Sequence, residues 1–167
     1  MPLVKDGRLV DDPWVGLADD APVPAEGLVF VSLTRFRAER DALLARGAPL
    51  GVRLKSSELA PEIGTDVPLL ALVAVEFPTF RDGRGYTTAR LLRERFGFKG
   101  ELRAVGDVLR DQVLFMHRCG FDAFEVADEA ALEGLKAAMA EFTVFYQPAT
   151  DDRTPASVLR RVRSAAE

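Results

Sequence analysis

A glycine-rich turn carries two arginines directly ahead of a basic amphipathic segment. Arg81 and Arg84 lie in the run RDGRG, and Tyr86 and Thr87 follow it at once. The free amides and the dipole of a helix N-terminus attract anions, and two guanidinium groups beside them could clamp a phosphate, sulfate or carboxylate. The turn therefore predicts a small-anion site formed by these four residues.

The same turn also has a purely structural interpretation. Asp82-Gly83 is ordinary turn chemistry, and Arg84 could pair with Asp82 or with Glu76 at the surface. The spacing fits neither nucleotide motif, because no Gly-Lys-Ser/Thr follows the turn and GRGYTTA lacks the third glycine of the dinucleotide fingerprint. The anion clamp and the structural loop both stay open.

A second polar loop offers carboxylate chemistry. Asp107, Arg110 and Asp111 fall within about one helical turn, and Asp107 and Asp111 could share one face. Like charges so placed raise the pKa of one carboxyl group or hold a cation, which would suit a general acid and base, with Arg110 joining the anion site. The structural alternative is a helix N-cap with an ion pair to Arg110.

Apolar runs and amphipathic segments alternate along the chain and would hold these loops. Continuous apolar runs are typical of strands buried on both faces, and the alternation implies parallel strands joined by right-handed crossovers. The predicted strands are residues 28–33, 50–54, 69–77, 101–105, 122–126 and 142–146, and the predicted helices are 35–46, 87–96, about 107–120, 130–141 and about 155–166.

These elements predict an α/β fold of about six parallel strands, either a partial (β/α)-barrel-like sheet or an open doubly wound sheet. In both, loops leaving the carboxyl ends of the strands share one rim where ligands bind. The two polar loops would meet there, together with Arg35 and Lys55. An incomplete barrel leaves strand edges that the N-terminal hairpin or a second subunit, as in a homodimer, must cover.

Three regions are predicted along the chain. Residues 1–27 form an arm in which apolar pairs flank Asp6-Gly7, a strong hairpin signal, ahead of a proline-rich linker that Trp14 pins to the body. Residues 28–148 form the α/β domain. Residues 149–167 form a basic helix with interleaved apolar residues, which packs on its own domain or docks an acidic partner protein.

Composition narrows the classes of function. The chain has 167 residues, 48% of them hydrophobic, and a formal charge of −4, which suits one globular domain and disfavours nucleic acid as a partner. A single cysteine, Cys119, and a single histidine, His117, exclude an intramolecular disulfide and argue against a metal site. No apolar stretch approaches the ~18 residues of a membrane span, and no signal core is present, which predicts a cytoplasmic protein without membrane contact.

Three sequence runs carry a family resemblance. RDGRGY, ELRAVGDVLRDQ and RCGFDAFE follow one another at fitting distances within residues 77–126. The chain resembles an uncharacterised bacterial family of small proteins whose genes neighbour assimilatory sulfite reductase and which are labelled probable oxidoreductases of sulfite reduction. The resemblance implies a role in sulfur assimilation, with the sulfite-reducing enzyme as a partner and sulfite, sulfate or phosphate as the anion.

The residues argue against a literal reading of that label. Sulfite reduction delivers several electrons through metal or haem centres with cysteine and histidine ligands, and the chain has no flavin, nicotinamide, haem or iron–sulfur signature. The favoured hypothesis is an accessory protein that binds a small anion or docks to the reductase and is not itself the redox catalyst. Two alternatives stay open: a small (β/α)-type enzyme using Asp107 or Asp111 as acid and base on an anionic substrate, and a pure protein-interaction module.

Overall fold

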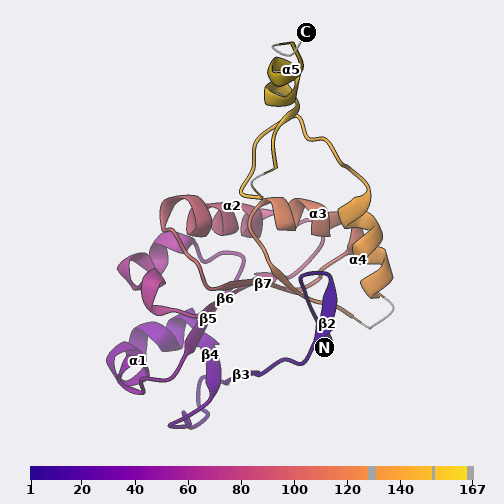
Figure 1. The fold of residues 1–167 in the computed structure, drawn as a ribbon. Helices are drawn as coiled ribbons and strands as arrows, with labels where there is room; N and C mark the ends of the chain where they lie inside the picture. The colour runs from indigo at the N-terminus through magenta and orange to yellow at the C-terminus, as the bar shows by residue number, and fades with distance from the viewer. Residues whose placement is uncertain (128–130, 152, 165–167) are drawn as a thin grey trace.

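The structure, a computed structural model, describes residues 1–127, 131–151 and 153–164 (Figure 1). Within these residues the strands are β1 (Leu3–Lys5), β2 (Arg8–Val10), β3 (Trp14–Gly16), β4 (Leu28–Ser32), β5 (Leu50–Leu54), β6 (Leu72–Phe77), β7 (Glu101–Gly106) and β8 (Ala123–Glu125). The helices are α1 (Leu33–Ala45), α2 (Arg84–Arg90), α3 (Arg110–Arg118), α4 (Ala131–Ala140) and α5 (Ala156–Ser164), with short 3₁₀ segments Ala60–Glu62 and Gly64–Leu69 and a π-helical turn Leu91–Arg95 that extends α2.

All eight strands form one sheet in the order β2-β1-β8-β7-β6-β5-β4-β3. Every neighbouring pair from β3 to β8 is parallel and consecutive in the chain, whereas β1 pairs antiparallel with both β2 and β8. A doubly wound sheet reverses its strand order at a switch point, and this sheet does not. The barrel-like alternative is therefore the correct one, and the sheet is curled.

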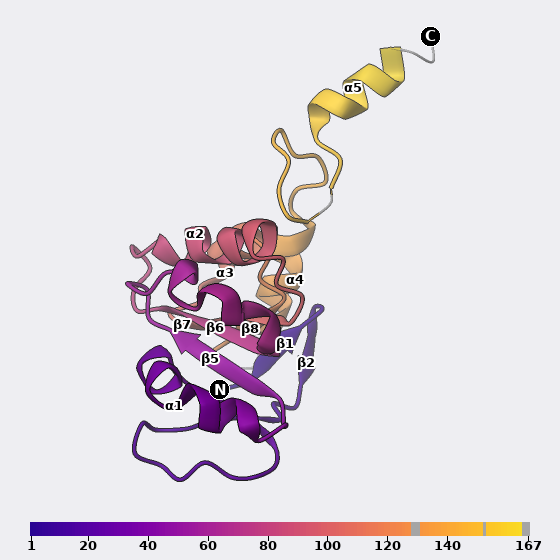
Figure 2. The same cartoon turned by 90° about the vertical axis from the view of Figure 1, so that its left-hand side faces the viewer.

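The helices α1 to α4 lie on the outer, convex face of the sheet (Figures 1 and 2). Side chains alternate along each strand, so Val73, Val75 and Phe77 of β6 belong to the core beneath the helices. A Cβ at Gly85 of α2 would lie 2.7 Å from the Phe77 ring, and this close approach fixes the helix against β6. Burial of these apolar side chains is the main stabilising contribution.

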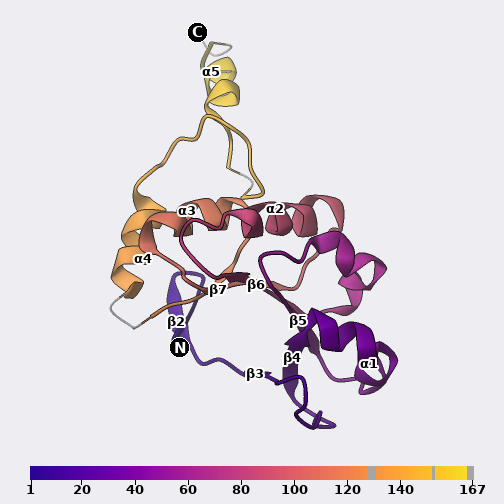
Figure 3. The same cartoon turned by 180° about the vertical axis from the view of Figure 1, so that it is seen from behind.

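The N-terminal chain closes the concave side of the sheet. β2 lies at one edge and β3 at the other, yet only residues 11–13 separate them, and Figure 3 shows this link crossing below the sheet. Three linking residues reach at most roughly 15 Å between flanking Cα atoms, whereas the edges of a flat sheet of this size would be about 34 Å apart. Residues 8–16 therefore act as a closing segment that joins the two edges of the curled sheet.

A buried arginine holds the closing segment in place. Arg103 lies on the inner face of β7 with 0% of its surface exposed. Its guanidinium donates to both carboxylate oxygens of Asp12, at 2.6 and 2.9 Å, and to Glu101 at 2.9 Å, and it also reaches Glu125 at 3.4 Å. Because Asp12 belongs to the closing segment, this interior ion network ties the segment to the wall of the sheet.

The structure corrects the predicted strand count. Five predicted strands are confirmed as β4 to β8, and the N-terminal hairpin is confirmed as β1 and β2 around the Asp6-Gly7 turn. The predicted strand at 142–146 is wrong: Phe145 of that run instead stacks between the guanidinium groups of Arg118 and Arg153, with no strand partner in the described chain. The sixth parallel strand is β3, so the sheet has eight strands with β1 and β2 added antiparallel, not about six parallel ones.

Boundaries shift at several elements. The predicted helix 87–96 begins three residues earlier, at Arg84, and the predicted strand 69–77 begins at Leu72 because a 3₁₀ segment occupies the residues before it. The predicted start of the fourth helix at residue 130 lies outside the described residues, as do residues 165–167 of the terminal region. The predicted domain boundary after residue 27 falls between β3 and β4, which pair in one sheet.

Candidate functional site

The carboxyl ends of β3 to β6 surround a cavity of about 270 Å³, called here the mouth pocket. In (β/α) barrels this end of the strands is where ligands and catalytic groups gather. Its polar side chains come from the ends of three strands and the loop after β5, and Phe30 and Leu17 supply apolar walls. The polar lining residues are Ser32, Arg53, Lys55, Glu58 and Glu76.

Two cations of the mouth pocket differ in how they are engaged. Arg53 forms an ion pair with Glu76 at 3.2 Å across the neighbouring strands β5 and β6. The Lys55 ammonium has no ion pair within the described residues, although the Lys55 backbone N–H donates to Glu58 at 2.7 Å. Lys55 is therefore the cation that an incoming anion meets with least competition.

Ser32 forms the wall of the pocket at the end of β4. Its hydroxyl caps α1 by accepting the Arg35 backbone N–H at 3.0 Å, and it donates to Asp19 at 2.6 Å. The buried Arg35 side chain donates to the carbonyl oxygens of Ala18 and Ala21 and so fixes the loop after β3. Arg35, predicted at the rim, therefore holds the rim loop rather than facing the pocket.

The predicted arginine clamp lies next to the mouth pocket, but one of its two arginines, Arg84, is already engaged by other side chains of the protein. Arg84 donates to the two carboxylate oxygens of Asp82 at 2.9 and 2.7 Å and to the Ser56 hydroxyl at 3.0 Å. The Arg84 guanidinium holds the pKa of Asp82 well below its usual range. The ion pair of Arg84 with Asp82, which the structural interpretation of the turn predicted, is therefore present. Ser56 directly follows Lys55 of the mouth pocket, so the hydrogen bond from Arg84 to Ser56 places the start of α2 beside the pocket.

The other predicted anion ligands lie around the start of α2. Arg81 and Thr87 are exposed, and Arg81 has no ion pair within the described chain. Tyr86 packs edge-on against Phe77 with ring centroids 5.4 Å apart. Burial raises the pKa of Tyr86, and the nearby Cys119 and Asp111 add to the effect. Anion binding by these residues stays a prediction.

The loop after β7, which was the second predicted polar loop, holds the β6–α2 loop in place. The Asp107 carboxylate accepts the Phe80 backbone N–H at 2.8 Å, and Gln112 donates to the Phe80 carbonyl oxygen at 3.1 Å. Asp111 is exposed, and Arg110 packs its aliphatic stem against α4, where a Cβ at Gly134 would lie 3.1 Å from it. The acid–base role of Asp107 and Asp111 stays a prediction, while their loop demonstrably positions the β6–α2 loop.

The family comparison covers most of this site. A family model described as a bacterial protein of unknown function (DUF934) matches residues 51–157. The chain belongs to this family. The match runs from β5 into α5 and includes both polar loops, which agrees with the resemblance to an uncharacterised bacterial family. A comparison with curated proteins found no match.

Of the charged mouth-pocket residues that the DUF934 match contains, Lys55 was predicted at the rim, whereas Arg53, Glu58 and Glu76 were missed as site residues. Arg53 and Glu76 are single charged residues inside otherwise apolar strands, LGVRL and LVAVEF, and each points to the concave side by alternation. A charge at such a position within a buried strand is the signal that could have identified them, since unpaired charges are rarely buried.

The remaining reactive residues of this DUF934 protein lie away from the mouth pocket. His117 lines a larger cavity near the amino ends of the strands. Cys119 caps the C-terminal end of α3 and is partly buried, and this burial raises the pKa of its thiol. Among the described residues, no group of three or more metal-ligating side chains is gathered. No helix in the described part of the chain has both the length and the apolar character needed to cross a bilayer.

Proposed function

We propose that this DUF934 protein binds a small oxyanion in the mouth pocket and acts as an accessory protein of assimilatory sulfate and sulfite reduction, without being the redox catalyst. The observation that carries the binding proposal is the presence of Lys55 and Arg53 in one cavity of about 270 Å³ at the carboxyl ends of the strands. A cavity, rather than a flat rim, favours a ligand over a function confined to protein docking.

The charges of the mouth pocket suggest how an anion would be held. Lys55 would supply the principal attraction, because its ammonium has no ion pair in the described chain, although a solvent-exposed charge pair contributes only about 0.2–1 kcal/mol. Arg53 would be shared with Glu76. The Ser32 hydroxyl gives its one proton to Asp19, so it does not contribute a donor. Glu58 and Glu76 lower the positive potential of the pocket, so the affinity for an oxyanion is expected to be modest.

The link to sulfite reduction rests on the family resemblance, in which neighbouring genes encode assimilatory sulfite reductase. Sulfite, sulfate and phosphate are therefore the anions to test first. With one cysteine and one histidine in the sequence, the chain itself offers no cysteine or histidine ligand set for a reducing centre. The accessory role is to bind the anion or to present it to the reductase.

Thermal unfolding with added anions tests the binding proposal. At about tenfold excess over Kd, sulfite or sulfate should raise the Tm by roughly 3–6 °C. Lys55→Ala should abolish the rise, and Lys99→Ala, which removes an exposed lysine remote from the mouth, should retain it. Arg81→Ala with Arg84→Ala tests the neighbouring turn separately. An unchanged rise in Lys55→Ala would refute the mouth pocket as the site.

The accessory role needs a cellular test. In a strain lacking this gene, growth on sulfate as the sulfur source should fail or slow, while growth on cysteine should be normal. The wild-type chain should restore growth on sulfate, and Lys55→Ala should not. Normal growth of the deletion strain on sulfate would exclude the role in sulfur assimilation while leaving anion binding itself intact.

A further inference from the structure

The chain beyond α4 forms an arm that stands away from the body. After Ala140 the chain leaves the helical layer, and α5 lies clear of the sheet and of the other helices (Figures 1 and 2). The root of the arm is firmly attached: Arg118 of α3 forms an ion pair with Asp151 at 3.1 Å, donates to the Gln147 carbonyl oxygen at 2.6 Å and stacks over Phe145. The arm is thus anchored at its base and extended beyond it.

The extended part of the arm exposes apolar side chains. Val158 and Leu159 of α5 are 41% and 42% exposed, and Phe142, Val144 and Tyr146 of the arm are more than half exposed. Scattered apolar residues on a surface are normal, but a cluster of them marks a contact site. α5 is also basic, since its sequence ASVLRRVRS contains three arginines and no acidic residue. The arm therefore suits an apolar receptor with acidic edges.

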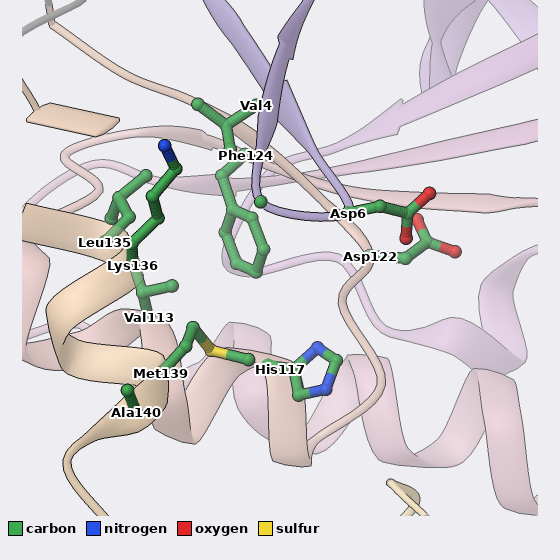
Figure 4. Close-up of a pocket in the computed structure, with 11 residues that line it drawn as sticks. Val4, Asp6, Val113, His117, Asp122, Phe124, Leu135, Lys136, Met139 and Ala140 are labelled. Atoms are coloured by element: carbon green, nitrogen blue, oxygen red, sulfur yellow. The ribbon is translucent and has the colours of Figure 1, made fainter. Parts of the chain in front are cut away.

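The body of the molecule contains such a receptor. A cavity of about 530 Å³ lies between the β1–β2 turn, α3 and α4, on the outer side of the sheet near the amino ends of the strands (Figure 4). Its walls are apolar and come from four elements. They are Val4, Val113, Phe124, Leu135 and Met139. We call this cavity the hairpin groove.

The edges of the hairpin groove are charged unevenly. Asp6 and Asp122 lie next to one another on one side, and Lys136 lies on the opposite side (Figure 4). Lys136 already forms an ion pair with Glu133 at 2.8 Å, and Asp122 is bound by Arg93 at 2.8 Å. Asp6 has no ion pair within the described residues, so the acidic side has capacity for a further cation.

The arm leaves the body beside the hairpin groove. His117 and Asp122 line the groove and also line a second cavity, of about 330 Å³, whose far wall is Thr150 and Asp151 at the root of the arm. The root of the arm is therefore a neighbour of the groove. Exchange of an identical element between protomers is a common route to a symmetric dimer.

We propose that α5 of one chain docks in the hairpin groove of a second copy, and that the exchange is reciprocal. Val158 and Leu159 bury against the apolar walls, and the exposed Arg161 of α5 faces Asp6 and Asp122. This is a helix-in-groove contact, and the acidic edge matches the basic helix. The proposal is independent of anion binding, because the groove lies at the opposite ends of the strands from the mouth pocket.

Sedimentation velocity over a wide range of protein concentration tests the proposal. The wild-type full-length chain should dimerise. Val158→Asp with Leu159→Asp should weaken the dimer by roughly a hundredfold or more, because two apolar side chains lose their burial. Ala140→Trp should do the same by filling the groove from an exposed position. Leu69→Asp, at an apolar residue that is 53% exposed on the 3₁₀ segment before β6, is the control and should leave the dimer intact.

Mixing the two interface variants gives the decisive readout. The arm variant keeps an intact groove and the groove variant keeps an intact arm, so the mixture should form heterodimers although each variant alone is monomeric. A wild-type chain that stays monomeric at all concentrations would overturn the proposal and would indicate a different occupant of the groove or of the arm. A dimer that both variants leave unchanged would overturn it as well.

Discussion

Single charged side chains within apolar strands define the two functional parts of this barrel-like sheet. Arg103 has no exposed surface and is surrounded by carboxylates, whereas the Arg53 side chain is 46% exposed at the mouth pocket and has one carboxylate partner. A buried arginine with several partners serves stability and specificity, and a half-exposed one can take a ligand. The difference in exposure indicates that Arg103 stabilises the fold and leaves Arg53 as a candidate for the proposed site.

Removing the buried guanidinium should be costly. Arg103→Ala leaves Asp12, Glu101 and Glu125 without their shared cation, and loss of one member of a buried ion network typically costs about 3–5 kcal/mol. Arg95→Ala, at an exposed arginine, should change the free energy of unfolding by no more than about 0.5 kcal/mol. Urea unfolding measures both, and equal effects would show that the interior network is not stabilising.

The same network predicts an acid dependence of stability. Burial alone would raise the pKa of Asp12, but hydrogen bonds from Arg103 and from the Trp14 backbone N–H outweigh it and the pKa lies below the ordinary 3.8. The unfolded chain therefore takes up this proton first as the pH falls, so the stabilisation is full above the unfolded pKa and is lost as the pH falls through the folded one. The stability difference between wild type and Asp12→Asn, measured by urea unfolding, should shrink from neutral pH towards pH 3, and a constant difference would contradict the lowered pKa.

Loops of this protein are positioned by backbone contacts between neighbouring elements. Gly106 ends β7 at φ +94°, and a Cβ there would lie 2.5 Å from the Phe77 carbonyl oxygen. This close approach lets the Asp107 backbone N–H donate to Phe77 at 2.7 Å and its carboxylate accept from Phe80. The β6–α2 loop, which carries Arg81 and Arg84, is thus held by the loop after β7.

Two glycine substitutions separate backbone strain from steric clash. Gly97→Ala, at φ +63° with open space around it, should cost about 1–2 kcal/mol. Gly106→Ala adds a clash with Phe77 and should cost a further ~1–3 kcal/mol, and it should also alter the amide NMR signals of Phe80 and Asp107. If both variants had the same stability, the close packing at Gly106 would be disproved.

At the scale of the whole molecule, residues 8–16 bridge the two edges of the curled sheet. The segment pairs with β1 at one edge and with β4 at the other, and Asp12 of its central link reaches Arg103 across the interior. Exposed strand edges promote aggregation, and the short strands β2 and β3 of this segment cover the edges of β1 and β4. The N-terminal region is thus part of the sheet and not an appendage to it.

Truncation at the two ends should have opposite consequences. Deletion of residues 1–13 removes β1, β2 and Asp12, so we expect loss of cooperative thermal unfolding and aggregation of the chain. Deletion from residue 156 onward removes α5 and should preserve the melting transition at concentrations where the wild-type chain is monomeric, because α5 lies clear of the body (Figure 2). Circular dichroism melts distinguish the two, and an unaltered melt after the first deletion would contradict the closing role.

The sequence pattern predicted the strands and turns that are determined by neighbouring residues. It missed the elements that depend on contacts between residues far apart in the chain. Apolar runs identified β4 to β8, and Asp6-Gly7 identified the hairpin, because local periodicity and turn chemistry decide those elements. β3 was missed because three residues between prolines carry no periodic signal. The run 142–146 has the composition of a strand, but its Phe145 ring instead makes cation–π contacts with Arg118 and Arg153.

The same reasoning from the sequence predicted only part of the candidate site. The polar loops were located at the correct end of the strands, but the hydrogen bonds of Arg84 with Ser56 and of Asp107 with Phe80 join residues far apart in the chain. The ion pair of Arg53 and Glu76 depends on the register of β5 and β6, which no single run of residues reveals.

Crystals soaked in selenate, a heavier analogue of sulfate, would test anion binding at the mouth pocket most directly. Anomalous scattering from selenium locates the bound anion without reference to the protein model. The account predicts a selenium peak within hydrogen-bonding reach of the Lys55 ammonium and the Arg53 guanidinium, and its absence in Lys55→Ala crystals. Occupancy confined to other sites, or no bound selenium at the mouth pocket, would contradict it.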